Sequence, residues 1–262
     1  MVTQPADTAA AITKGVAYLR REAPKSNHNP DAARALLVAG ARGHDIGNSL
    51  DDTLAFLQDP SKWAPAARVD NAAALAAATR AGKAPDTALA TAAKLLLDDQ
   101  KADGSFGATT ATWSARATLI ESGKLPDDFV IVQIDKWFLG LEPGSIVDAS
   151  AAILALDQTS NVMADGLRAK CLALVREAQL PGGGWGPTAG DAPQVFDTAL
   201  AVLALATLDI EPRLARATYR PEELKAAIAG GRAWLVSKQR ADGSWPDTLS
   251  TTGWAILALL GH

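Results

Sequence analysis

Apolar and polar positions follow a helical period along most of the chain, and strand-like alternation is almost absent. Clusters of glycine and proline divide the sequence into segments of helical length, which fall into pairs. The pattern predicts six helix pairs, at residues 8–22 and 31–40, 50–58 and 70–81, 86–99 and 110–122, 128–139 and 147–157, 163–178 and 195–208, and 221–238 and 249–260.

The two helices of each predicted pair differ in their apolar pattern. First helices such as "ITKGVAYLRRE" have one apolar and one charged face, whereas second helices such as "DTALAVLALA" are apolar nearly all round, which is typical of a helix buried on most faces. Six buried and six amphipathic helices fit an inner and an outer ring. We therefore predict an all-α fold, a single α6/α6 toroid domain over residues 1–262, with an open repeat solenoid as the competing architecture.

Three connections inside these pairs share one spacing between a glutamine and an aromatic residue. They are "QKADGSF" at 100–106, "QLPGGGW" at 179–185 and "QRADGSW" at 239–245. The glutamine ends a helix whose last carbonyls lack partners, so its amide can donate to backbone there. Asp-Gly favours a tight turn, and the ring then covers the turn. We interpret the motif as structural and do not expect Gln100, Gln179 or Gln239 to be catalytic.

Composition narrows the range of functions. The chain has 262 residues, 48% of them hydrophobic and 21% charged, with a net charge of −4, and this mild acidity argues against nucleic-acid binding. One cysteine, Cys171, excludes an internal disulfide framework and a Cys-x-x-Cys zinc or redox pair. We find no basic region followed by a long apolar run at the N-terminus, and no apolar stretch of about 18 residues. We therefore expect a cytoplasmic protein without a transmembrane segment.

The three glutamine–aromatic stretches resemble the QW repeats of the terpene cyclase and protein prenyltransferase superfamily, squalene–hopene cyclases especially. "VFDTALAVLAL" and "TTGWAILALL" also resemble the inner helices that follow such motifs there. The resemblance covers most of the chain, although pairs one, two and four are degenerate. It implies the toroid fold and an apolar ligand, such as an isoprenoid, in a central cavity at the rim where inner helices begin. The same fold serves both enzymes and non-catalytic proteins.

Four aspartates, Asp31, Asp70, Asp148 and Asp197, begin predicted inner helices and suit two roles. They could contact a ligand or supply a proton, or they could be N-caps that accept from backbone N–H groups. The family resemblance implies an acid at the third residue of D-x-D-D-T-A, but Asp197 aligns with the fourth residue. The acid position falls on Phe196, and on Val147, Val69 and Pro30 in the other pairs.

Asp148 and Asp197 are nevertheless the candidate catalytic residues, because they begin the inner helices of neighbouring pairs. Two carboxylates brought close in a poorly hydrated cavity would repel, and one would tend to keep its proton. Five residues are candidates for contacting the ligand: Asp70, Trp113, Phe196, Trp254 and His28. The three aromatic residues suit core packing equally well, and a loop histidine such as His28 is more often a turn residue.

We expect no metal and no other cofactor. Prenyltransferases use Asp, Cys and His as zinc ligands near inner-helix starts, whereas Cys171 lies midway along an outer helix and is interpreted as a small buried hydrophobe. Two hypotheses about function remain open. One is a small stand-alone protein that binds an isoprenoid or other apolar molecule and transforms it in a cyclase- or isomerase-like reaction. The alternative is a non-catalytic binding or protein-interaction module, or a subunit of a larger complex.

Overall fold

The structure is a computed structural model that describes residues 6–156, 162–210 and 220–261. Within these residues it contains twelve α-helices and no β-strand. The chain divides into two compact units, one formed by Met1–Leu19 with Pro143–His262 and the other by Arg20–Glu142. The predicted helices are confirmed to within two residues at each end, except that residue 157 lies outside the described residues. A single domain over the whole chain stays a prediction.

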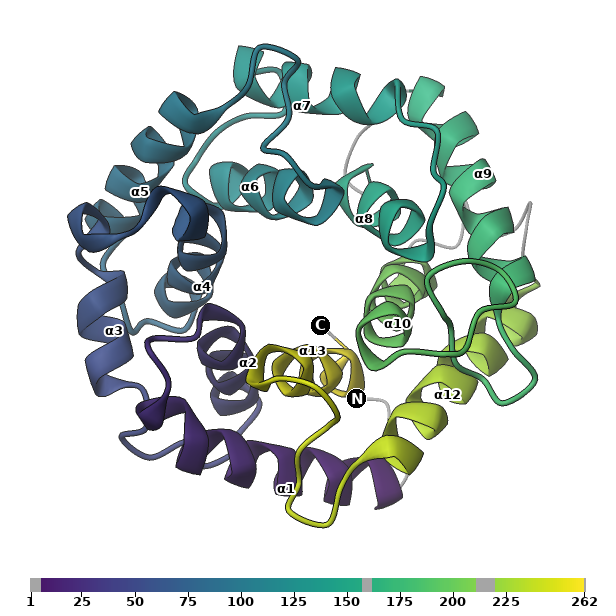
Figure 1. Cartoon of the computed structure of the whole chain (residues 1–262). Helices are drawn as coiled ribbons and strands as arrows, with labels where there is room; N and C mark the ends of the chain where they lie inside the picture. Colours follow the sequence, from purple (N-terminus) through teal and green to yellow (C-terminus); the bar gives the residue numbers. More distant parts are fainter. Residues whose placement is uncertain (1–5, 157–161, 211–219, 262) are drawn as a thin grey trace. The chain divides into compact units, whose positions relative to one another are not determined.

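The unit Arg20–Glu142 contains three inner helices, which are the second members of their pairs, and three outer helices. The inner helices are α2 (Pro30–Ala41), α4 (Arg68–Arg80) and α6 (Thr109–Glu121), and the outer ones are α3 (Asp51–Leu57), α5 (Asp86–Asp99) and α7 (Phe129–Leu139). Helix α4 packs against α2 and α6 and also against α5 outside it (Figure 1). Alanine is abundant on α2 and α4, and the fully buried alanines let neighbouring backbones approach closely.

The other unit repeats this arrangement with longer outer helices. Its outer helices are α1 (Ala6–Glu22, up to Leu19), α9 (Val162–Ala178) and α12 (Pro221–Lys238), and its inner helices are α8 (Ile146–Leu156), α10 (Val195–Ile210) and α13 (Leu249–Leu260). Helix α10 packs against α8 and α13 and also against α12 (Figure 1). Every residue of α13 from Thr251 to Leu260 is buried, as the apolar sequence of this helix predicted.

The three glutamine turns have the same hydrogen bonds. In each, the glutamine side-chain amide donates both to the carbonyl of the turn glycine and to a carbonyl of the next outer helix. The acceptor pairs are Gly104 and Val130 for Gln100, at 3.0 and 3.2 Å; Gly183 and Ala227 for Gln179, at 2.9 and 3.0 Å; and Gly243 and Ala11 for Gln239, at 3.0 and 2.8 Å. The predicted donation from the amide to backbone is confirmed, but the acceptors are the turn glycine and the next outer helix and not the last carbonyls of the glutamine's own helix. The second bond joins one outer helix to the next.

The turn glycines are required for two reasons. Gly104, Gly183 and Gly243 have φ of 93°, 91° and 92°, which side-chain-bearing residues rarely adopt. A Cβ at any of them would also overlap the backbone carbonyl of the next outer helix, at Gln133, Gly230 and Lys14 respectively. Each turn therefore rests directly on the backbone of that neighbouring helix.

The aromatic ring of the turn fits a gap in the same neighbouring helix. Trp185 and Trp245 are 0% and 1% exposed, and each indole N–H donates at 2.7 Å to a carbonyl of its own outer helix. A Cβ on Gly231 or on Gly15 would lie 2.7 or 2.9 Å from these rings. Helix α7 carries Ile134 at the corresponding position, and there the ring is the smaller, half-buried Phe106. Ring size thus matches the space that the next helix leaves.

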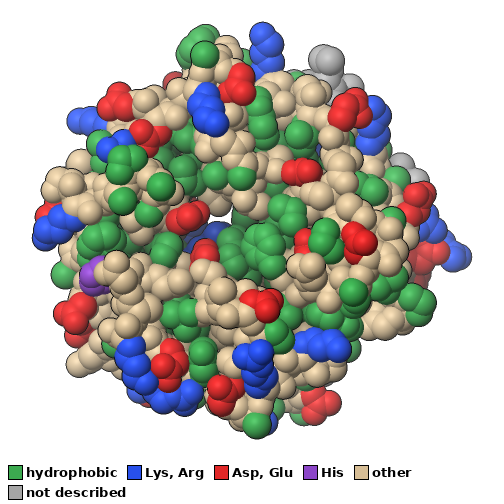
Figure 2. All heavy atoms as spheres, viewed as in Figure 1, with side chains coloured by type: hydrophobic (Ala, Val, Ile, Leu, Met, Phe, Trp, Pro, Cys, Tyr) green, Lys and Arg blue, Asp and Glu red, His purple; other side chains and the backbone are tan. Residues whose placement is uncertain are grey.

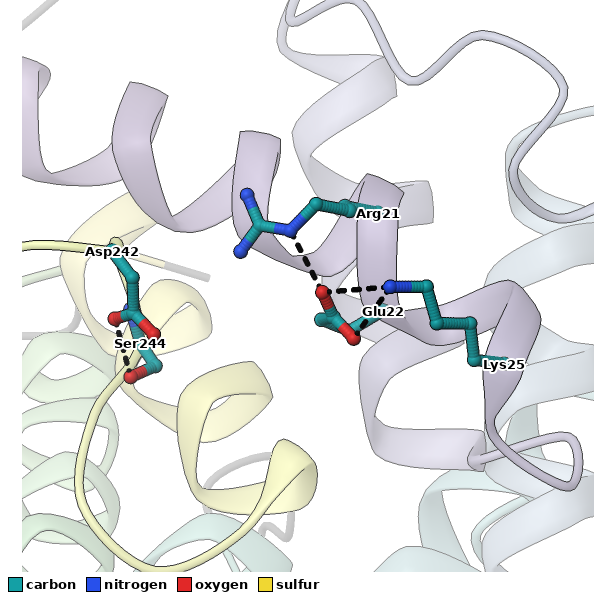
Figure 3. A network of polar contacts seen from close by, with 5 residues as sticks. All are labelled: Arg21, Glu22, Lys25, Asp242 and Ser244. Atoms are coloured by element: carbon teal, nitrogen blue, oxygen red, sulfur yellow. Dashed lines mark hydrogen bonds and ion pairs between the residues drawn. The ribbon is translucent and has the colours of Figure 1, made fainter.

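Side-chain carboxylates also stabilise the turns and helix ends. Asp242 Oδ1 accepts from the Ser244 backbone N–H at 3.0 Å and from its hydroxyl at 2.7 Å, which closes the Asp-Gly turn (Figure 3). Near the end of α1, Glu22 pairs with Arg21 at 2.7 Å and with Lys25 at 3.1 Å (Figure 3). On the face seen in Figure 2, acidic and basic side chains are interspersed and do not gather into a basic patch.

Candidate functional site

The four candidate aspartates lie inside the first helical turn, so their interpretation as N-caps is wrong. Asp31 is the second residue of α2, and Asp70, Asp148 and Asp197 are the third residues of α4, α8 and α10. The cap of α2 is Asn29, whose side chain accepts from the Ala32 N–H at 2.9 Å. Ser145 Oγ accepts from the Asp148 N–H at 3.0 Å. The four carboxylates still lie near the positive N-terminal ends of the helix dipoles, which stabilise their negative charge.

Asp197 differs from the other three in its burial. It is 4% exposed, whereas Asp31 and Asp148 are half-buried and Asp70 is exposed. Burial raises the pKa of Asp197 to about 6; its own backbone N–H opposes this shift, and Asp191 adds to it. The adjoining Thr198 fixes the register of this turn, because its hydroxyl accepts from the Trp185 N–H at 2.9 Å. Asp197 is therefore a buried carboxyl that holds its proton at higher pH than an ordinary aspartate.

Phe196 shares the first turn of α10 with Asp197, and its ring packs on Trp254 of α13. The rings of Phe196 and Trp254 have their centroids 5.6 Å apart and are nearly perpendicular, at 83°. Trp254, on α13, is 7% exposed, and Phe196 is half-buried. Edge-to-face rings of this kind pack stably, and they also present π faces that attract positive charge. The geometry brings two of the predicted ligand contacts together.

Asp148 lies on α8, which packs against α10, but its contacts differ from those of Asp197. The Ser145 hydroxyl donates to Asp148 Oδ2 at 2.8 Å. Asp148 is not among the groups that raise the pKa of Asp197, so that shift has a cause other than the carboxylate pair that the sequence suggested. Asp148 instead acts on Cys171, whose thiol pKa is raised to about 12, mainly by burial. Cys171 is 0% exposed, which confirms its interpretation as a small buried hydrophobe.

The unit Arg20–Glu142 holds a different charged cluster, built around Arg34 on α2. Its guanidinium carbon lies 5.5 Å from the centroid of the Trp113 ring, which is 7% exposed. Partial burial, and then Asp31, raise the pKa of Asp70, while Arg34 opposes the shift. Burial lowers the pKa of Arg34. Asp70 keeps more than a third of its surface exposed, so solvent screens these effects more than at Asp197.

Sequence reasoning did not select Arg34, although a signal was present. It is the one charged residue after Asp31 in "DAARALLVAG", and a charge in such an apolar helix is unusual. His28 was selected, and the structure places its ring in a parallel stack on Phe56 of α3, with centroids 4.4 Å apart and planes at 6°. Its φ of 53° is unusual for a residue with a side chain.

In residues 6–156, 162–210 and 220–261, no group of three or more His, Cys, Asp or Glu side chains is placed to hold a metal ion. In the same residues, every helix is too short or too polar to cross a membrane.

No protein-family model and no curated protein matches this sequence. Among solved structures, the chain is similar to a variant of the type II terpene cyclase MstE from Scytonema, in complex with its substrate geranylgeranyl dihydroxybenzoate. The two are 14% identical, and the alignment covers 97% of each chain with a TM-score of 0.69. At this identity the likeness shows the fold, and it confirms the predicted fold class, the all-α α/α toroid.

Proposed function

We propose that this protein binds an isoprenoid or similarly apolar molecule beside the first turns of α10 and α13, and that Asp197 protonates it. The observation that carries the proposal is the buried carboxyl of Asp197, whose pKa is raised to about 6, next to Phe196, whose ring packs on Trp254 of α13. The cyclase-like fold supports the choice of substrate class. The reaction would be an isomerisation that closes a ring.

The proposed chemistry needs only one carboxyl group. Asp197 would transfer its proton to one carbon of a terminal C=C bond, which leaves a cation on the other carbon and a carboxylate on Asp197. A second C=C of the same chain would attack the cation, forming the ring bond and moving the charge along the chain. Loss of a proton to the carboxylate would then end the reaction and restore the acid, so that product and substrate have the same composition.

Phe196 and Trp254 would act on the positive charge. Aromatic faces stabilise a nearby cation by about 0.5–2 kcal/mol each, and more where water is excluded. Burial would also favour the neutral acid before transfer, because a carboxylate is poorly solvated there. The expected pH profile follows from the pKa: turnover rises as the pH falls toward 6, because the protonated fraction of Asp197 increases.

The test compares the parent with Asp197→Asn, which keeps the shape and removes the transferable proton. Both are incubated at pH 6 with geranylgeraniol and with geranylgeranyl dihydroxybenzoate, and products of unchanged mass but new retention time are measured by chromatography and mass spectrometry. We expect such isomers from the parent, and a loss of at least about 100-fold in the variant. Asp86→Asn, at an exposed first-turn aspartate of α5, is the matched control and should leave turnover unchanged. Equal turnover by parent and Asp197→Asn would refute the acid role.

One observation favours a second, non-catalytic function. The position of the family acid is occupied by the apolar Phe196, so the usual proton donor is replaced by a residue that can only contact a ligand. A binding module would bind these molecules without isomerising them, and Asp197→Asn would bind them with the affinity of the parent. Calorimetric titration alongside the product assay separates this function from catalysis.

A further inference from the structure

The connection between α9 and α10 is longer than the other two glutamine turns. After Phe106, inner helix α6 begins at Thr109, and after Trp245, α13 begins at Leu249. After Trp185, however, α10 begins only at Val195. The extra segment is "GPTAGDAPQ", residues 186–194, which we call the inserted loop. Insertions in a repeat fold usually become loops on one face, and that face often binds the ligand.

The inserted loop is folded back on itself and anchored. The Gln194 N–H donates to the Trp185 carbonyl at 2.9 Å, which closes its base. The Ile146 N–H, at the start of α8, donates to the Pro187 carbonyl at 2.8 Å. At Gly186 a Cβ would lie 2.6 Å from the Ala192 carbonyl oxygen, so the two arms of the loop approach each other too closely for any side chain there. The loop is thus fixed at the first turns of α8 and α10.

Asp191 has a fixed orientation within this loop. Its Oδ2 accepts from the Thr188 N–H at 3.1 Å and from the Thr188 hydroxyl at 2.5 Å. Although exposed, Asp191 is the charged group that acts on Asp197. The helices packed against α10 also carry charged residues, but none of these is among the causes of the shift at Asp197. They are Asp148 on α8 and Glu222, Glu223, Lys225, Arg232 and Lys238 on α12. Residues Leu249–Leu260 of α13 carry no charge at all.

The inner helices of the chain provide an internal comparison. Asp31, Asp70 and Asp148 stand in the same region of their helices as Asp197, and none of them is buried. Asp70 also follows a long connection, residues 58–67, but that connection contains two short 3₁₀ helices, Pro60–Lys62 and Pro65–Ala67. We propose that the inserted loop is a positioning element for Asp197, which covers this carboxyl and presents Asp191 to it, so that Asp197 remains in its proton-donating form. The use made of that proton rests on the function proposed above, whereas the effect of the loop on Asp197 does not.

The inserted loop acts on Asp197 in two ways, through the negative charge of Asp191 and through its cover over the carboxyl, and different variants remove them. Asp191→Asn removes the negative charge and keeps the cover. Replacing Gly186–Gln194 by Pro-Asp-Thr, the residues that join Trp245 to α13, removes both. Thr188→Val removes the hydroxyl bond that orients Asp191, and as a surface change it should leave the fold intact. Asp148→Asn is the control, because Asp148 does not contribute to the shift.

The measurement is the titration of the Asp197 carboxyl by carbon-detected NMR in the full chain. We expect a midpoint near 6 in the parent, a fall of a few tenths to about one unit in Asp191→Asn, a smaller fall in Thr188→Val, and a return toward about 4 in the loop replacement. An unchanged midpoint in both Asp191→Asn and Thr188→Val would overturn the role of Asp191. A midpoint near 6 in a folded loop replacement would overturn the role of the loop.

The same variants distinguish this inference from the proposed function. If the midpoints move as expected but the parent forms no isomer from either probe, the positioning role stands and the proposed reaction fails. If the parent forms isomers, its pH profile should move with the midpoint in Asp191→Asn. A profile that stays in place while Asp197→Asn is inactive would overturn the inference and keep the reaction.

Discussion

The α9–α10 region and the α5–α6 region have the same structural frame, and they differ in the residues placed between its parts. In both, the glutamine joins its turn to the next outer helix, and a threonine hydroxyl, of Thr198 or Thr112, accepts from the N–H of the aromatic residue at 2.9 or 3.0 Å. The residue before that threonine is the buried Asp197 in one region and the half-buried Ala111 in the other. Only α10 is preceded by the inserted loop.

The glutamine turn therefore fixes the register of an inner helix but does not determine which functional groups that helix carries. A carboxyl at the position before the threonine becomes a proton donor only if something covers it, because an exposed carboxylate is well solvated and ionises normally. Helix α10 has a carboxyl at this position and the inserted loop before it, whereas α6 has neither. Asp148 shows the intermediate case, with a carboxyl that a hydroxyl contacts but that stays half-buried.

The largest expected effect concerns the two rings. Trp185→Ala removes a ring that is fully buried and hydrogen-bonded, and should lower the free energy of unfolding by about 3–5 kcal/mol. Phe106→Ala removes a half-buried ring and should cost roughly half as much or less. Urea unfolding followed by circular dichroism measures both. Equal losses would show that the fit between ring and neighbouring helix does not distinguish the two turns.

The second prediction concerns the stability cost of the buried acid. Asp197 has a higher pKa folded, about 6, than an unfolded aspartate, about 3.9, so the folded state holds more protons between these values. Stability therefore falls as the pH rises through that window, by about 3 kcal/mol in all. Asp197→Asn should accordingly be more stable than the parent at pH 7, by about 2–3 kcal/mol, and lose this advantage near pH 4.

A matched variant in the other region sharpens this prediction. Ala111→Asp places a carboxyl before Thr112, where no inserted loop covers it. Its pKa should stay near the ordinary value, and the stability change from Ala111→Asp should depend little on pH between 5 and 8. Thermal unfolding of all three proteins from pH 4 to pH 8 provides the test. A pH-dependent loss in Ala111→Asp as large as that of Asp197 would show that the helix position alone creates the acid.

The helices and the glutamine turns could be predicted from the sequence because they depend on local patterns. Apolar periodicity gave the helix ends to within two residues. The place of Gln239 at a helix end predicted that its amide donates to backbone, and one acceptor, Gly243, lies in the adjoining turn. Its second acceptor, Ala11, lies 228 residues away, and no local pattern indicates it. Gly15 and Gly231 are residues that lower helix stability, and their presence is explained only by the tryptophan rings that pack against them.

The candidate site was predicted in part, because burial depends on elements far apart in the chain. Asp197 was selected from its place at a helix start, but the burial that distinguishes it from Asp148, which we attribute to the inserted loop, could not be read from the helix alone. The capping interpretation was wrong by two residues at Asp31 and by three at Asp148, because Asn29 and Ser145 just upstream are equally good caps. The contact of Arg34 with Trp113 could not be predicted from the sequence, because it depends on how α2 and α6 are placed in the fold.

The third prediction tests the fit of the ring to α12 with two adjacent glycines. A Cβ at Gly231 would lie 2.5 Å from Val202 Cγ2 and 2.7 Å from the Trp185 ring, whereas at Gly230 the nearest atoms are 3.4 Å away. Gly231→Ala should therefore lower the free energy of unfolding by about 1–3 kcal/mol. Gly230→Ala should be neutral or stabilising by up to about 1 kcal/mol, because alanine favours the helix. If both variants unfold alike, the ring is not held against Gly231.

The smallest expected effect concerns the glutamine amides themselves, which both regions share. Gln179→Ala and Gln100→Ala each remove two hydrogen bonds to backbone carbonyls and should cost about 1–2 kcal/mol. Because the contacts are equivalent, the two losses should agree within about 0.5 kcal/mol, unlike those of the rings.

Gln179→Glu keeps the size of the side chain but presents a carboxylate to two carbonyls. At pH 7 it should therefore lower the free energy of unfolding more than Gln179→Ala does. The two variants should become similar in stability as the pH falls and the carboxylate is protonated. Unfolding in urea at pH 7 and pH 4 measures the stability of the parent and of the three variants. A Gln179→Glu variant as stable as the parent at pH 7 would mean that the hydrogen bonds of the amide do not stabilise the turn.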